Sequence, residues 1–183
     1  MDLRALLLAV VLLPHHPAAP QQAPRGHPER GALVTDSGVG ALRLRMTPDE
    51  VRSVMRVVAD TMLPNWDCVE PERTLLVRLG TDTVRAAVSA QGRVDRIDIY
   101  SPRFRTADGI HVGATVQSVL RPGAKGGVSE ATVGFQLPSH CGLRFVVAHA
   151  PDLERAADLD YRQLRAFPQA ARVSRIEIVG CGP

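Results

Sequence analysis

The stretch RVDRIDIY, residues 93–100, has a second copy in RVSRIEIV, residues 172–179. Each copy alternates polar and apolar residues, which predicts a strand with arginine and an acid on one face and two isoleucines on the other. Because the pattern occurs twice, we expect two equivalent strands, one at the end of each half of the chain.

A shared pattern for the start of a helix precedes each copy. Residues 42–55 and 110–120 both show alternating apolar residues, then a threonine, then apolar residues at helical spacing. The sequence TPDE at 47–50 is a capping-box signature with proline at the first helical position, and Thr115 is the matching cap. A tandem duplication explains the repeated order.

The predicted fold is therefore α+β, with two tandem units that each pack a helix on a three-stranded antiparallel meander. The first unit covers residues 33–101. The second covers residues 102–183 and carries an inserted segment at 151–168 where the first unit has a short turn. The apolar face formed by Val51, Val54, Met55 and Val58 predicts the first helix, which ends before a proline.

The amino-terminal sequence indicates export. An unbroken apolar run at residues 5–13 follows Arg4 and is too short to span a bilayer, so residues 1–19 are predicted to be a signal peptide. Residues 20–32 are rich in proline and are predicted to be a disordered spacer. We expect a secreted or periplasmic protein with no transmembrane anchor.

Composition argues against a nucleic-acid-binding protein. The 183 residues carry a net charge of +3, and arginines alternate with acids instead of clustering on one face. Lys125 is the only lysine, which we interpret as the coding bias of a GC-rich genome.

Three cysteines, Cys68, Cys141 and Cys181, suggest one disulfide in an exported chain. In a three-stranded antiparallel meander, the turn between the first two strands lies at the same end of the sheet as the carboxyl end of the third strand. Cys141 is predicted in that turn and Cys181 at the end of the third strand, so the two could lie close enough for a disulfide and we favour a Cys141–Cys181 bond. Cys68 is the alternative partner for Cys181.

The sequence Met-Thr-Pro-Asp-Glu-Val at 46–51, followed by a helix and a meander, resembles two exported families. One is the small lipoprotein of the outer-membrane β-barrel assembly machinery, and the other is the secreted β-lactamase inhibitory protein, whose two-unit layout is similar to residues 33–181. Both commonly have glycine before Met-Thr, where this chain has Arg45 in the first half and Gly113 in the second. The resemblance implies fold and export.

Residues 105–113 also resemble a motif, Arg-Thr-Ala-x-Gly-Ile-x-Val-Gly, of a group of uncharacterised exported bacterial proteins. That second resemblance implies no particular activity.

The one candidate for catalysis is a thiol-dependent hydrolase that uses Cys141 with His140 or His149. Adjacent residues in a strand point apart, so His140 is poorly placed to activate Cys141, and a disulfide is the better interpretation. The same residues lack the spacing typical of a zinc site. Asp95 and Asp98 face opposite sides of a strand and form no acid pair, and Arg96 with Asp98 is expected to be a solvated face.

We therefore expect an exported, non-catalytic binding module without metal or cofactor, whose partner is a protein or a cell-surface component. A peptidoglycan- or lipid-binding envelope subunit is a further alternative. The Trp66 loop and the segment 151–168 are the places where the two halves differ, so the expected partner contacts are Trp66, Arg155, Tyr161, Arg162 and Arg165.

Overall fold

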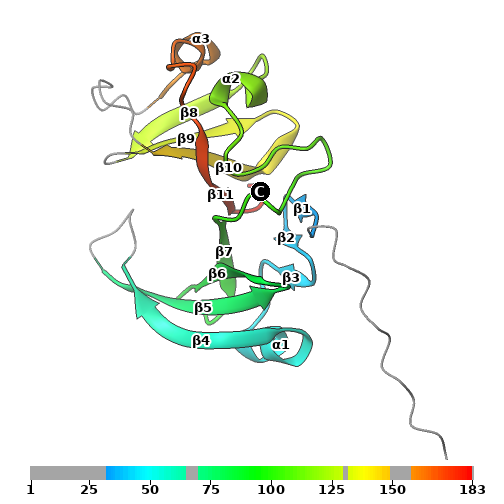
Figure 1. The fold of residues 1–183 in the computed structure, drawn as a ribbon. Helices are drawn as coiled ribbons and strands as arrows, with labels where there is room; N and C mark the ends of the chain where they lie inside the picture. Colours follow the sequence, from blue (N-terminus) through cyan, green and yellow to red (C-terminus); the bar gives the residue numbers. More distant parts are fainter. Residues whose placement is uncertain (1–31, 65–69, 130–131, 149–157, 183) are drawn as a thin grey trace, which may run out of the picture.

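The computed structural model describes residues 32–64, 70–129, 132–148 and 158–182. Eight strands form one antiparallel sheet in the order β4-β5-β6-β7-β11-β10-β9-β8, and three short strands form a second sheet (Figure 1). The elements in chain order are β1 (Val34–Thr35), β2 (Gly38–Val39), β3 (Leu42–Arg43), α1 (Pro48–Val54), β4 (Arg56–Leu63), β5 (Glu72–Leu79), β6 (Asp82–Val88), β7 (Val94–Ile99), α2 (Val116–Val119), β8 (Lys125–Ser129), β9 (Thr132–Leu137), β10 (His140–Ala148), α3 (Tyr161–Arg165) and β11 (Val173–Ile178).

The predicted α+β class is wrong, because the protein is mostly β. Each half contributes four strands to the large sheet instead of three, and the two halves share that one sheet. The three described helices have seven, four and five residues. The chain therefore does not form two separate helix-plus-meander units.

The first error lies just after α1. The expected capping box is present at Thr47 and Glu50, but the helix ends at Val54 and Met55 is already extended. Residues 56–63 then form β4, in which β-branched residues suit a strand better than a helix. Val51 is buried, whereas Val54 and Val58 are 56% and 40% exposed, so the helical spacing that included them was accidental.

The second difference from the predicted fold is β8, a fourth strand in the second half, where a three-stranded meander was expected. Its residues pair with β9, with Gly126 opposite Phe135 and Gly127 opposite Gly134. A Cβ atom on Gly126 would lie 2.8 Å from the carbonyl oxygen of Gly134. The glycine therefore allows two backbones to approach closely inside the sheet.

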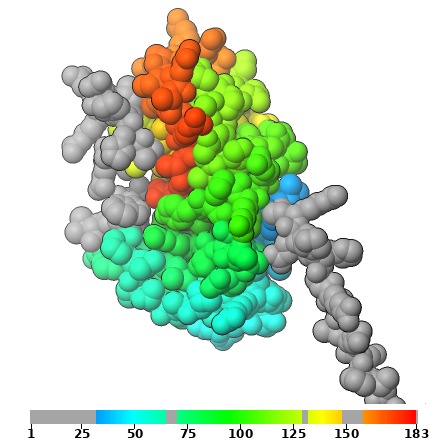
Figure 2. All heavy atoms as spheres, in the orientation of Figure 1, coloured from blue at the N-terminus to red at the C-terminus, as the bar shows by residue number. Residues whose placement is uncertain are grey.

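The two copies of the repeated sequence pair with each other at the centre of the sheet. β7 and β11 are antiparallel neighbours, with Ile97 opposite Ile178, Asp98 opposite Glu177 and Ile99 opposite Ile176. We call this pair of strands the seam. In Figure 2 the green residues of the first half lie directly against the red residues of β11.

One hydrophobic core covers one face of the sheet. The seam isoleucines point into it, together with Phe135 and Phe145 from the second half. Figure 1 shows α1 near one end of the sheet, α2 and α3 near the other, and β1–β3 between them. Each of these elements adds buried side chains to that core, for example Val39, Val116 and Leu164.

Corresponding backbone bonds anchor the two helix starts to the seam. The Arg45 and Gly113 amides donate to the carbonyl oxygens of Val94 and Val173, and the amides of these valines donate back to Met46 and Ala114. Arg45 and Gly113 both have positive φ, at 70° and 92°. Arginine therefore occupies a backbone conformation that favours glycine.

Replacing Arg45 with glycine should raise the free energy of unfolding by about 1 kcal/mol, because glycine adopts positive φ without the Cβ penalty. Urea unfolding of R45G beside the wild-type protein measures the gain. The variant R43G, at an exposed position in β3, is the control and should lose stability. Equal losses in both variants would contradict the explanation.

Candidate functional site

The candidate site is the face of the eight-stranded sheet opposite the core, which we call the polar face. No described helix packs on it. On the strands at and beside the seam, its larger side chains are Arg85, Arg96, Asp98, Tyr100, Arg144, Arg175 and Glu177.

Two acids face each other at the middle of the polar face. Asp98 and Glu177 are direct cross-strand partners, and they are only 5% and 1% exposed. Like charges opposite each other destabilise a sheet, and burial adds the cost of removing both from water. The expectation that Arg96 and Asp98 form a solvated face is therefore wrong for Asp98. The acid pair that does form joins the two copies of the repeat.

Arginines on both sides compensate the two acids. Arg96 Nε lies 3.1 Å from Asp98 Oδ1, and the same guanidinium also bonds Glu72. Glu177 lies 2.5 Å from Arg144 Nε and 2.5 Å from Arg175 Nη2. Charge-assisted pairs of this kind fix side chains in one arrangement, so the polar face presents a rigid set of charges.

Arg175 is the least completely satisfied member of the set. Its side chain is 10% exposed, and its Nε is buried without a hydrogen-bond partner in the described structure. Glu177 Oε1 is close enough to Arg175 to form an ion pair, but the angle is poor for a hydrogen bond. Arg175 Nη1 donates to the Tyr100 hydroxyl at 3.4 Å, which links the two strands at one end of the seam.

Burial raises the pKa of Asp98 to about 6 from the usual 3.8, and the nearby Glu177 carboxylate adds to the rise, while Arg96 and Arg175 oppose it. The folded protein therefore binds this proton more tightly than the unfolded chain does. The resulting stabilisation is complete below pH 3.8 and is lost as the pH rises through about 6.

The stability of the wild-type protein relative to D98N should fall by up to about 3 kcal/mol between pH 4 and pH 7, at 1.36 kcal/mol per pKa unit. Asparagine keeps the shape of the side chain but does not titrate. Urea unfolding of both proteins at half-unit pH steps measures the difference in their unfolding free energies. The other acids are present in both proteins, so their contributions to that difference cancel. Parallel pH profiles would show that Asp98 ionises as an ordinary surface acid does.

The two halves differ in how they place the arginine that lies beside the central acids. Arg144, opposite Glu177, bonds that acid. Arg85, opposite Asp98, instead lies over the ring of Tyr100, 5.0 Å from its centroid. The residue at the end of the second copy is Val179, which has no ring to attract an arginine. Tyr100 and Val179 are each 38% exposed.

A depression of about 590 Å³ lies over β8, β9 and β10, with Lys125, Gln136, Arg144, Asp158 and Val179 among its lining residues. Gly134 is part of its floor, and a Cβ atom there would lie 2.9 Å from Arg144 Cδ. The glycine thus lets the Arg144 side chain lie flat across the neighbouring strand.

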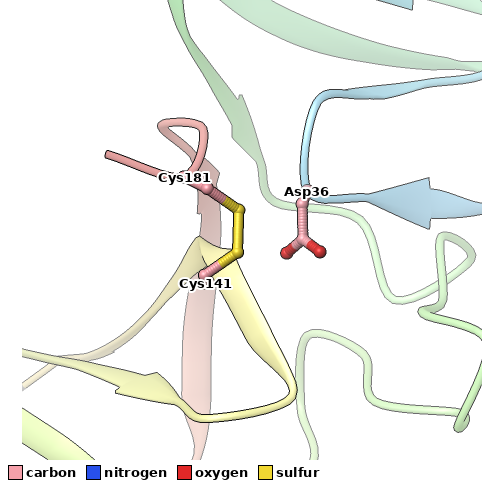
Figure 3. Close-up of side chains that lie close together, drawn as sticks. All are labelled: Asp36, Cys141 and Cys181. Atoms are coloured by element: carbon pink, nitrogen blue, oxygen red, sulfur yellow. A yellow bond between two sulfur atoms is a disulfide. The ribbon is translucent and has the colours of Figure 1, made fainter. Parts of the chain in front are cut away.

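The structure contains the favoured disulfide, Cys141–Cys181, with the two α-carbons 4.9 Å apart. Figure 3 shows Asp36 beside the two sulfur atoms. These three residues are close enough together to suggest a metal site, but both sulfurs are bonded to each other and only one carboxylate remains as a ligand. Asp36 Oδ1 accepts a hydrogen bond from the Gly142 amide at 3.0 Å, so it joins the β1–β2 turn to β10.

The hydrolase alternative lacks a free nucleophile in this structure, because the Cys141 sulfur is bonded to Cys181. His140 Nε2 lies 3.1 Å from Asp108 Oδ1 and is engaged there. His149 lies outside the described residues.

The motif at residues 105–113 is a hydrogen-bonded turn. The Thr106 amide donates to the Ile110 carbonyl oxygen, and the buried Thr106 hydroxyl accepts from the Ile110 amide at 2.9 Å. Gly109 has a φ of 87° and supplies the positive φ that the turn needs. The motif thus has a local structural role.

The five expected partner contacts lie away from the seam or outside the described structure. Trp66 and Arg155 are outside the described residues. Tyr161, Arg162 and Arg165 belong to α3, where Tyr161 packs partly against the core and Arg165 lies 5.8 Å from its ring centroid. Sequence reasoning missed the polar face, although the arginine–acid alternation in both repeats was the available signal.

The disulfide is consistent with an extracytoplasmic protein, because such bonds persist in oxidising compartments. None of the described helices has the length and apolar character needed to cross a bilayer.

The chain is similar in fold to a protein of known structure. The crystal structure of the uncharacterized protein YfeY from Escherichia coli aligns with a TM-score of 0.57 and 14% sequence identity, over 80% of this chain and 99% of that one. No model of a known protein family matches the chain, and no curated protein matches its sequence.

Proposed function

We propose that the protein is an exported, non-catalytic binding module that recognises a partner through the polar face. The observation that carries this proposal is the row Arg85, Asp98, Glu177 and Arg144, which crosses four adjacent strands as direct cross-strand partners. Ion pairs that are desolvated contribute little to folding, so stability alone does not account for charges at the centre of a sheet.

The exposed residues around that row support a protein partner. Tyr100 lies next to two arginines and is 38% exposed, and tyrosine and arginine are among the residue types enriched at energetically important interface positions. The neighbouring ion pairs hold these side chains in place, which lowers the entropy lost on binding. Secretion or residence in the periplasm would bring the face into contact with partners outside the cytoplasm.

A photo-crosslinking amino acid at Val179 tests the proposal in the organism that produces the protein. Val179 is exposed on the polar face, whereas Val54 on α1 is exposed elsewhere and is the matched control. We expect a discrete protein adduct from position 179 and none from position 54. Adducts only at position 54 would place the interface elsewhere. Adducts with lipid or glycan would favour the envelope-subunit alternative over a protein partner.

A further inference from the structure

The polar face of the first half carries three arginines that have no acidic partner among the residues that the structure describes. Arg56 in β4 lies directly opposite Arg78 in β5, and Arg85 in β6 faces Leu76 of β5, two residues along the same face. None of the three forms an ion pair in the described structure. In the second half, by contrast, Arg144 and Arg175 both contact Glu177.

The three arginines form a continuous arrangement, which we call the arginine strip. Arg56 and Arg78 are exposed, and Arg85 is half-buried against Tyr100. Direct cross-strand placement of two arginines is unfavourable in the isolated protein, because like charges repel. An anionic ligand placed over the strip would reverse that effect.

We infer that the arginine strip, with Tyr100 at its inner end, is a docking site for an extended acidic segment of a protein partner. Neighbouring strands are about 4.8 Å apart and alternate residues along an extended chain are about 6.6 Å apart. The two spacings differ by about 2 Å, which long arginine side chains on adjacent strands can span, so alternate carboxylates of a bound segment can each reach a guanidinium group. Arginine binds carboxylates in a bidentate geometry. This inference rests on the proposed function.

The surroundings favour spaced carboxylates over a phosphate polymer. Asp98 and Glu177 lie immediately beyond Arg85 and Tyr100, and their charge opposes an anion of high charge density that extends across the seam. The chain itself has a net charge of +3, which also argues against a second copy as the occupant.

Fluorescence anisotropy with a labelled hexapeptide of alternating glutamate and threonine tests the site. We expect saturable binding that weakens with added salt, and an affinity about five- to tenfold lower for R78Q/R85Q, as the loss of two charge contacts implies. The control is R162Q/R165Q, which removes the same charge from α3 and likewise leaves a tyrosine without its arginine.

Equal losses in the two double variants would mean diffuse charge attraction and would overturn the inference, as would tighter binding of polyphosphate than of the peptide. Failure of the peptide to bind, with the position 179 adduct intact, would overturn the arginine strip while leaving the proposed function standing. If the peptide binds but position 179 gives no protein adduct, the arginine strip would stand and the proposed function would be overturned.

Discussion

Replacing Glu177 with glutamine is expected to lower the free energy of unfolding by about 3–5 kcal/mol, the usual cost of leaving a buried charge uncompensated. Glu177 is 1% exposed and pairs with Arg144 and Arg175. Arg144 is 33% exposed at its side chain and can turn toward water, but Arg175 cannot. Urea denaturation at pH 7.5 measures the loss.

Two further variants separate charge from packing. D82N removes an acid from the exposed Arg103–Asp82 pair and should cost at most about 1 kcal/mol. R175M/E177L replaces both partners by apolar side chains and should lose less stability than E177Q alone. Equal losses in E177Q and D82N would mean that the seam charges are not energetically buried.

The second large effect is expected from the disulfide. The bond joins residues 40 apart, and a loop of that size should contribute between about 3 and 5 kcal/mol in the chain-entropy model. The variant C141S/C181S should therefore unfold at a clearly lower temperature, and its stability should not respond to reductant.

The third cysteine supplies the control for that measurement. C68S retains both bonded cysteines, so it should keep the wild-type unfolding temperature and the full response to reductant. A reductant-insensitive wild-type protein would contradict the prediction.

Sequence reasoning succeeded where the deciding interactions are local. The capping box at Thr47 and Glu50 is a contact between residues three apart, and its signature can be recognised without tertiary structure. The inward direction of Ile97 and Ile99 follows from strand alternation alone. The cysteine pairing was also favoured correctly, because Cys141 and Cys181 lie beside adjacent strands.

Sequence reasoning failed where partners are distant along the chain. The burial of Asp98 depends on β7 pairing with β11, and no local pattern specifies that register. The apolar residues after α1 fitted a helical spacing as well as a strand, so the choice between them depended on the available sheet edge at β5. The candidate site was missed for the same reason, since Arg85, Asp98, Glu177 and Arg144 come from four different strands.

The seam has a consequence for the order of folding. β11 is the last strand of the described chain, yet it occupies the centre of the sheet between β7 and β10. Contacts between residues near 98 and 177 have a large sequence separation, which slows folding. Until β11 arrives, β7 has an open edge able to pair with other chains. We therefore expect the folding intermediate in which β11 is not yet paired to be the form of this protein most prone to aggregation.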